Sequence, residues 1–226
     1  MIPPGDFFSQ HLDLMEHYTG IARSFARAIK QSGVKRVVHL SSIGAHLEGQ
    51  TGLLLAQSQV EYILEEIPNV DITFLRPAAF YYNLKFFVNM IKNSGIIMSN
   101  YGGDDMVLWA APKDVAQAAA QALESAVAGT IIRYVVSEQI SCNDTASILG
   151  KAIGKPELTW QIISGEQMFN ILTKVGMNPQ FAKGLIEMNC RVLDGSLYED
   201  YFQHPSKLGE EKLAGFVREF AAAYYG

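Results

Sequence analysis

The sequence predicts an α/β protein with a parallel sheet flanked by helices and a smaller, mostly helical C-terminal region. Short β-branched runs recur along the first 137 residues, and each follows a segment in which apolar residues have helical spacing. These runs lack the polar–apolar alternation of half-exposed strands, which favours strands buried on both faces of a parallel sheet. We therefore assign the sheet to residues 1–137 and the smaller region to residues 138–226.

The first helix and strand are predicted from one apolar stripe and one glycine. Apolar residues of segment 11–32 fall three, four or seven positions apart, and Gly33 ends the predicted helix. A β-branched run from Val34 then leads into Ser41 and Ser42. The members of the stripe are Leu12, Met15, Ala22, Phe25 and Ile29.

The same order of helix, turn and strand then repeats. Segment 54–67 has a helical apolar face, Pro68-Asn69 breaks it, and segment 71–76 reads as the next strand. Segment 80–92 is expected to be helical. Segments 95–98 and 106–109 are expected to form a strand pair or a wide loop.

Capping signals define the remaining elements. Pro112 starts a helix whose small-residue face, from Val115 to Leu123, is expected to pack on the sheet, and segment 131–137 is a further strand. Ser141 with Asp144 resembles a capping box. Beyond segment 158–163 the chain is expected to be mainly helical, with a start at Asn178-Pro179 and a final inward face of Phe216, Val217, Phe220 and Tyr224.

Composition limits the class of protein. The 226 residues are 49% hydrophobic and 18% charged, which is ordinary for globular proteins, and a net charge of −5 argues against a nucleic-acid partner. No run reaches the roughly 18 apolar residues of a membrane span. Two cysteines and no apolar signal segment predict a reducing, cytoplasmic location.

Two motifs that resemble metal or phosphate sites have simpler explanations. Segment 150–156 faintly resembles a phosphate-binding loop, but three residues separate its glycines instead of four, and Pro156 replaces the Ser or Thr. We expect a helix C-terminus there. The five histidines are not spaced with Cys or carboxylates as metal ligands are, so no metal site is predicted. Neighbouring Asp104 and Asp105 are expected to be solvated in a Gly-rich turn.

Two groups are open to a functional interpretation. Ser41 and Ser42 follow a predicted parallel strand, at the edge where open α/β sheets bind ligands, and a role restricted to the turn explains them equally well. An aromatic group in segment 80–86 suits either a pocket wall or the core, and the core is the commoner case. Its members are Phe80, Tyr81, Tyr82 and Phe86.

Four segments in register resemble the NmrA-like branch of the atypical short-chain dehydrogenase/reductase superfamily. They are residues 33–45, Val60-Glu61, the Leu-Arg-Pro-Ala-Ala-Phe-Tyr-Tyr-Asn run at 75–83, and Lys113-Asp114-Val115-Ala116, and the likeness covers essentially the whole chain. The resemblance implies a Rossmann domain that binds NADP or NAD and a C-terminal region that closes over a small-molecule substrate.

The resemblance also implies site residues. Substrate contacts would involve Tyr82 and Asn83. Cofactor contacts would involve Pro3, Pro4, Ser41, Ser42, Gln57, Pro77, Ala78, Ala79 and Phe80.

Two departures from the family pattern bear on activity. The family's first strands and Gly-rich turn have no counterpart in this sequence, and they would amount to about 70 residues at about 30 or more per βαβ unit. The chain is therefore expected to be an N-terminally truncated form, which comes either from an incomplete gene model or from a true short product. Poor cofactor binding is expected in both cases. Counting back from Glu61 places Leu53 and Gln57 in the slots of the Tyr-x-x-x-Lys pair. Leucine cannot donate a proton, and glutamine carries no charge. The catalytic residues therefore stay unassigned.

The resemblance leaves three functions open. The first is an NAD(P)H-dependent reductase whose full-length form reduces a quinone or a similar small carbonyl compound. The second is a non-catalytic NAD(P)-linked redox sensor or binding module. The third is an inactive fragment that forms homo-oligomers through its uncovered sheet edge and first helix.

Overall fold

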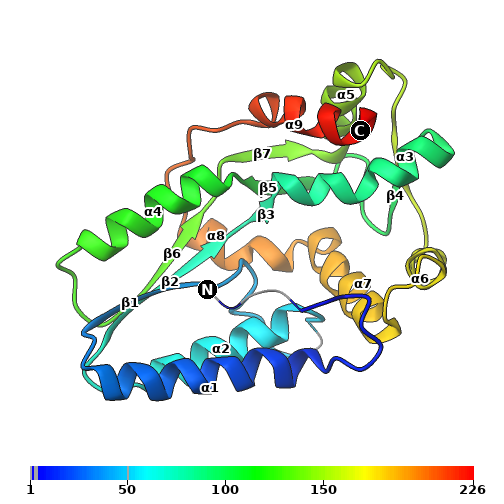
Figure 1. The fold of residues 1–226 in the computed structure, drawn as a ribbon. Helices are drawn as coiled ribbons and strands as arrows, with labels where there is room; N and C mark the ends of the chain where they lie inside the picture. The colour runs from blue at the N-terminus through cyan, green and yellow to red at the C-terminus, as the bar shows by residue number, and fades with distance from the viewer. Residues whose placement is uncertain (1, 3–4, 50) are drawn as a thin grey trace.

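The protein is a mixed α/β structure, as the sequence predicts. A computed structural model describes residues 2, 5–49 and 51–226, so the expected cofactor contacts Pro3 and Pro4 lie outside the described residues. Helices surround two three-stranded sheets and a separate strand pair (Figure 1).

The first sheet is parallel and has the order β1-β2-β6. The central strand β2 pairs Thr73 with Val38 of β1 and Phe74 with Ile132 of β6. β2 is buried along nearly all of its length, which explains why its sequence lacks polar alternation. The strands are β1 (Arg36–Leu40), β2 (Asp71–Pro77) and β6 (Thr130–Val135).

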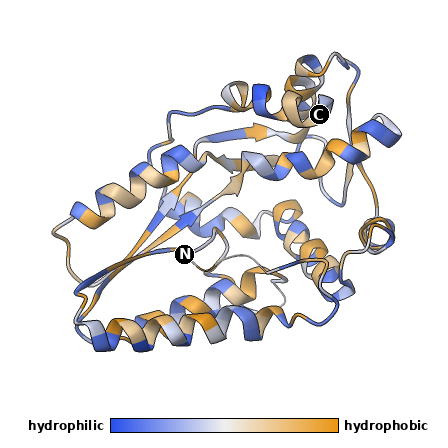
Figure 2. Cartoon of the chain, in the orientation of Figure 1, coloured by the Kyte–Doolittle hydropathy of each residue, from blue (hydrophilic) through white to orange (hydrophobic). Residues whose placement is uncertain are grey.

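Helices cover both faces of this sheet, with α1 and α2 on one face and α4 on the other (Figure 1). Ala22 of α1 and Val60 of α2 are fully buried in one core cluster with Phe74 of β2. Figure 2 shows blue and orange bands around α1, as expected of an amphipathic surface helix. The helices are α1 (Leu14–Ser32), α2 (Leu54–Glu65) and α4 (Pro112–Glu124).

Local sequence explains the ends of these helices. The Asp13 carboxylate caps α1 by accepting a backbone N–H bond of 2.9 Å, and Gly33 ends the helix at φ 72°. Pro112 opens α4 as predicted. The assignment of Leu123 to the sheet-facing side is wrong: it is 59% exposed, because it is turned by about 100° from the buried Ala122.

Segments 95–98 and 106–109 do contain strands, but the two strands do not pair with each other. β5 (Met106–Ala110) pairs in parallel with β3 (Ala79–Phe80) and antiparallel with β7 (Glu138–Ser141). β4 (Ile97–Ser99) instead pairs in parallel with β8 (Trp160–Ile162). Their partners lie far away in the sequence, so local patterns could not reveal them.

A second core lies where the helices around β5 meet. Tyr81, Leu84, Leu149 and Phe220 are nearly inaccessible to solvent in this cluster. The predicted helix at 80–92 is divided into a 3₁₀ segment, η1 (Tyr81–Phe87), and α3 (Val88–Ser94). The other two helices are α5 (Cys142–Ala152), capped by Ser141 as predicted, and α9 (Leu213–Tyr225).

The remaining helices form one side of the molecule next to the N-terminal segment. Ser164 opens α6 (Gly165–Lys174) with a capping box, and Asn178 caps α7 (Pro179–Leu193). The chain then returns to the first sheet through η2 (Ser196–Tyr198) and α8 (Glu199–Gln203). Throughout the described ranges, every helix is too short or too polar to cross a membrane.

Candidate functional site

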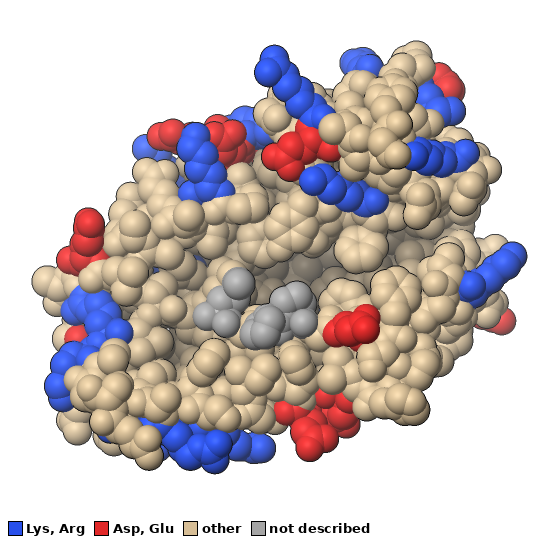
Figure 3. All heavy atoms as spheres, in the orientation of Figure 1, with Lys and Arg blue, Asp and Glu red and all other residues tan. Residues whose placement is uncertain are grey.

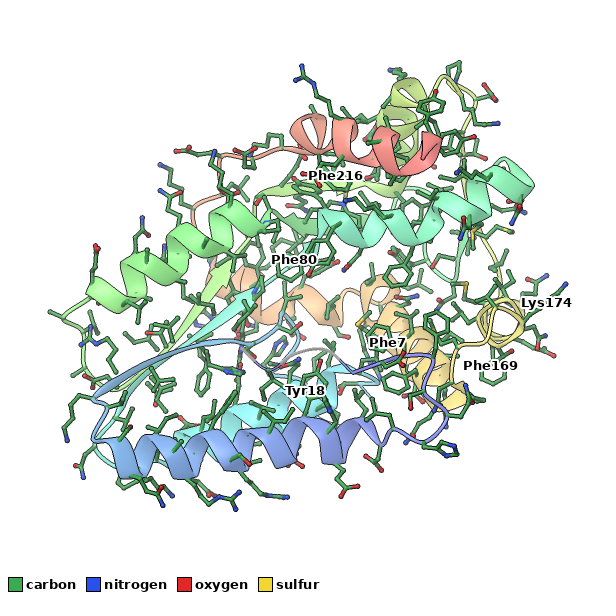
Figure 4. The ribbon with its side chains drawn as sticks, viewed as in Figure 1. Phe7, Tyr18, Phe80, Phe169, Lys174 and Phe216 are labelled. Carbon is green, nitrogen blue, oxygen red and sulfur yellow. The ribbon has the colours of Figure 1, made fainter. Side chains whose placement is uncertain are left out.

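A cavity of about 700 Å³ lies between η1, α3, β4 and β5 on one side and α6 and α7 on the other. This volume is typical of sites for small organic molecules. Phe7 and Phe8 of the N-terminal segment also line the cavity, and Phe7 packs on Phe181 of α7 with ring centroids 5.1 Å apart. Figure 4 shows Phe7 beside α7 and Phe80 beside the start of η1.

The N-terminal segment is fixed to the turn between α6 and α7 by hydrogen bonds. The backbone N–H of Asn178 donates to the Phe7 carbonyl at 2.9 Å, and its side-chain amide donates to the Ser9 carbonyl at 2.9 Å. The cavity wall is therefore built from segments about 170 residues apart in the sequence.

Four residues singled out from the sequence lie together at this cavity. Ala79 lines it from β3, Asn83 and Phe86 line it from η1, and Leu53 lines it from the start of α2. Leu53 is the residue that the resemblance places in the tyrosine slot, and its apolar side chain lines the cavity. Gln57, one turn further along α2, is not part of the lining, and its side chain forms no hydrogen bond with a described residue.

Ser41 and Ser42 lie at the carboxyl end of β1, as predicted, but their hydroxyls already have partners. The Ser41 hydroxyl donates to the Glu61 carboxylate, and the Ser42 hydroxyl donates to the Ile43 carbonyl at 3.0 Å. The Pro77 carbonyl accepts a bond from the backbone N–H of Ile43 at 2.9 Å. The backbone groups extend the hydrogen bonding of the sheet, and the two serine hydroxyls already donate hydrogen bonds within the protein.

The aromatic group of segment 80–86 divides between core and surface. Tyr81 is 2% exposed and belongs to the core. Phe80 and Tyr82 stack at 4.9 Å, and Tyr82 is 46% exposed outside the cavity lining. Phe86 is 62% exposed and lines the cavity. Ala78 is buried, and its N–H donates to the Val135 carbonyl at 3.0 Å.

A buried ion pair next to Ser41 joins α2 to the first sheet. Arg76 binds Glu61 through two nitrogens, at 2.6 and 3.1 Å, and both side chains are less than a tenth exposed. Nη1 of Arg76 also contacts the Tyr134 hydroxyl at 3.1 Å and the Asp200 carboxylate at 3.4 Å. This network connects α2, β2, β6 and α8.

Electrostatic interactions favour the charged forms of Arg76 and Asp200 in this network. Burial alone would lower the pKa of Arg76, but the hydrogen bond and charge of Glu61 raise it above its ordinary value. Burial alone would raise the pKa of Asp200, but the hydrogen bond from Tyr134 and the nearby positive charges lower it. The network holds the site in shape, because each buried charge has a hydrogen-bonded partner.

Asp114 of the Lys113–Ala116 motif has a comparable structural role. Its carboxylate accepts bonds from the Ser137 hydroxyl and from the backbone N–H groups of Glu210 and Glu211 at 3.2 and 3.3 Å. It therefore fastens the segment before α9 to β6 and β7. A Cβ at Gly209 would lie 2.1 Å from this carboxylate, so the contact requires glycine.

Sequence reasoning missed the walls that α6 and α7 contribute. Met168 and Leu172 of α6 and Phe181 and Met188 of α7 line the cavity, although they are ordinary apolar helix residues in sequence. Their local sequence pattern does not distinguish them from core residues.

The paired carboxylates of the Gly-rich turn have partners within the protein. Asp104 accepts a bond from the side-chain amide of Asn143 in α5, and Asp105 accepts one from the backbone N–H of Gly102 in the same turn. The described residues contain no cluster of three or more His, Cys, Asp or Glu side chains that could hold a metal ion.

The structure resembles several solved enzymes at low sequence identity. An NADPH-dependent quinone oxidoreductase from Escherichia coli in complex with NADPH matches with TM-score 0.74 and 20% identity, over 95% of this chain and 81% of that one. A triphenylmethane reductase from Citrobacter sp. in complex with NADP(H) matches with TM-score 0.73 and 21% identity, over 94% and 74%. A nucleoside-diphosphate-sugar epimerase from Staphylococcus aureus matches with TM-score 0.72 and 15% identity, over 92% and 73%.

These matches identify the fold as Rossmann-like. No protein-family model and no curated protein matches the sequence. The fold-class prediction is therefore confirmed by structure.

The residues expected to touch a dinucleotide fit only part of it. The Gln57 amide has no hydrogen-bond partner among the described residues and can bind a ribose or carboxamide group. Ala79 lines the cavity with a small side chain. Ser41 and Ser42 use their hydroxyls inside the protein. No described member of the expected set is cationic, so the set suits the nicotinamide half and not the diphosphate.

Proposed function

We propose that the protein belongs to the NmrA-like type of NAD(P)H-dependent reductases and that its site reduces a quinone or a similar small carbonyl compound. The observation that carries the proposal is the position of the cavity at the carboxyl end of β2, next to Ala79 and Asn83. Open α/β sheets bind their ligands at this edge. The solved enzymes of similar fold, which include a quinone oxidoreductase, support the reaction class.

In this proposal a bound nicotinamide supplies the hydride, and the protein orients the acceptor. The Asn83 amide, which has no partner among the described residues, donates a hydrogen bond to the substrate carbonyl oxygen. Leu53 excludes water from the face where related enzymes hold a tyrosine. The proton that completes the reduction then comes from water at the mouth of the cavity.

The experiment is NADPH and NADH oxidation with a panel of quinones, measured for wild type, Asn83→Leu and Asn170→Leu. Asn83→Leu removes the amide from the cavity, whereas Asn170 is exposed on α6 outside the lining and is the matched control. We expect turnover above the enzyme-free blank, a decrease of about tenfold for Asn83→Leu from the loss of one hydrogen bond, and no change for Asn170→Leu. Absence of turnover with any quinone refutes the proposal.

A second candidate is a non-catalytic NAD(P)-linked redox sensor. Leu53 at the cavity favours this function, because no proton donor occupies that position. Cofactor binding at micromolar concentration without turnover on any acceptor would select the sensor.

A further inference from the structure

The cavity lining is free of charge. Of all residues, 18% are Asp, Glu, Lys or Arg, yet none of the described residues that line the 700 Å³ cavity is charged or is a histidine. Burial raises the pKa of the lining residue Tyr101, so its phenol also stays neutral. Figure 3 shows a hollow on this face with a mostly tan surface, while Lys and Arg lie around the periphery. An ion transferred into such a cavity would lose hydration without gaining a counter-charge.

The lining contains an unusual share of polarizable groups. Five of the eight methionines in the sequence line this one cavity, together with phenylalanines from three separate segments. Thioethers make favourable contacts with aromatic rings and adapt to their outlines. The five methionines are Met90, Met98, Met168, Met177 and Met188.

Polar groups along one wall are neutral and unused. The side-chain amides of Asn83, Asn89 and Asn93 line the cavity from η1 and α3 and form no hydrogen bond with any described residue. Each amide has both donors and an acceptor, so it can bind a carbonyl or a hydroxyl group. Neither group requires a charge on the ligand.

The mouth of the cavity is apolar as well. Phe8, Phe86 and Val175 line the cavity and are 49%, 62% and 64% exposed. Apolar side chains that gather at the edge of a concave site extend the surface that can contact a ligand. A single-ring ligand would leave much of this surface in water.

We propose that this cavity binds an uncharged, multi-ring aromatic carbonyl compound and discriminates against anionic and cationic multi-ring aromatic compounds. The reduction of that compound rests on the proposed function, whereas its binding does not. Recognition comes from thioether and aromatic contacts with the rings and from the asparagine amides at the oxygen atoms. Selectivity comes from the missing counter-charge.

The test measures binding without any nicotinamide cofactor. Menadione, 1,4-naphthoquinone-2-sulfonate and a cationic triarylmethane dye are titrated into the full chain by calorimetry. Quenching of Trp109, which lines the cavity, provides a second readout. We expect menadione to bind about tenfold or more tightly than either charged probe. Equal or tighter binding of the sulfonate or of the dye overturns the proposal, as does the absence of menadione binding.

A charge introduced at one amide tests the location. Asn83→Asp changes an amide to a carboxylate of the same shape, and Asn170→Asp makes the same change outside the lining. We expect Asn83→Asp to weaken menadione binding and to strengthen dye binding, and Asn170→Asp to do neither. If both variants behave alike, the assignment to this cavity is wrong.

The outcomes separate this inference from the proposed function. Selective menadione binding without NADPH oxidation would retain the inference and refute the reductase. Turnover of the sulfonate as fast as that of menadione would retain the reductase and refute the inference.

Discussion

Protonation of His39 is expected to destabilise the protein as the pH falls below neutrality. His39 in β1 is 3% exposed, its Nε2 has no hydrogen-bond partner among the described residues, and its ring lies edge-on to Phe74 at 6.2 Å. Burial lowers its pKa from 6.5 to about 4. The unfolded chain therefore takes up the proton first, and stability present above pH 6.5 is lost as the pH falls toward 4.

The two pKa values set the size of the effect. Proton linkage lowers the free energy of unfolding by about 2 kcal/mol between pH 8 and pH 5. The full loss is about 3 kcal/mol and is reached below the pKa of the folded protein, where His39 is protonated in both states. This loss is a large part of the roughly 5–15 kcal/mol that stabilises an ordinary domain.

The assay is urea unfolding at pH 8, 7, 6 and 5, followed by tryptophan fluorescence, for wild type and His39→Leu. Leucine retains the apolar bulk and does not titrate. Burial also lowers the pKa of His46, so both proteins keep some pH dependence, and only their difference reports on His39. We expect that difference to change by about 2 kcal/mol between pH 8 and pH 5. Parallel pH profiles for the two proteins would refute the reasoning.

Three further changes test the packing of the site. Arg76→Met leaves Glu61 buried without its counter-charge and is expected to cost about 3–5 kcal/mol in chemical denaturation; a loss below 1 kcal/mol would contradict the buried pair. Gly52→Ala is expected to lower the free energy of unfolding by more than the roughly 1–3 kcal/mol that a positive φ costs a residue with a side chain. The additional cost arises because the new Cβ would lie 1.9 Å from the Gly184 carbonyl oxygen. An unchanged melting temperature would show that the two backbones do not approach so closely. Ser164→Ala removes the cap of α6 and is expected to cost about 1 kcal/mol, with Ser164→Asp restoring most of it.

The parts of the fold that the sequence predicted are those coded by local signals. Gly33, Pro112, Ser141 and Asn178 mark helix ends in the structure as they do in the sequence, because caps act within a few residues. Segment 71–76, which follows the Pro68-Asn69 break, was likewise predicted as a strand and is β2 in the structure. Pairing between β4 and β8 could not be predicted, since it joins segments about 60 residues apart.

The order of the strands predicts which residues lie near one edge of the sheet, whereas their role in binding stays a prediction. Parallel strands end at one edge of the sheet, so Ser41 and Ala79 were located correctly near that edge. Their partners were not predictable: the Ser41 hydroxyl bonds to Glu61, and the cavity beside Ala79 is closed by α6 and α7. Those contacts depend on tertiary packing, which leaves no local pattern in the sequence.

Positions 53, 57 and 61 connect the cavity to the buried ion pair along α2. They follow one another at i, i+4 spacing and therefore lie along one face of α2, which runs from the cavity at Leu53 to the buried ion pair at Glu61. The Glu61 end binds Arg76 and Ser41 and contributes to stability. The Leu53 end faces the cavity and contributes no hydrogen bond. The ion pair lies two helical turns away from Leu53 and does not involve its side chain. The fold is therefore compatible with a residue at position 53 that donates no proton.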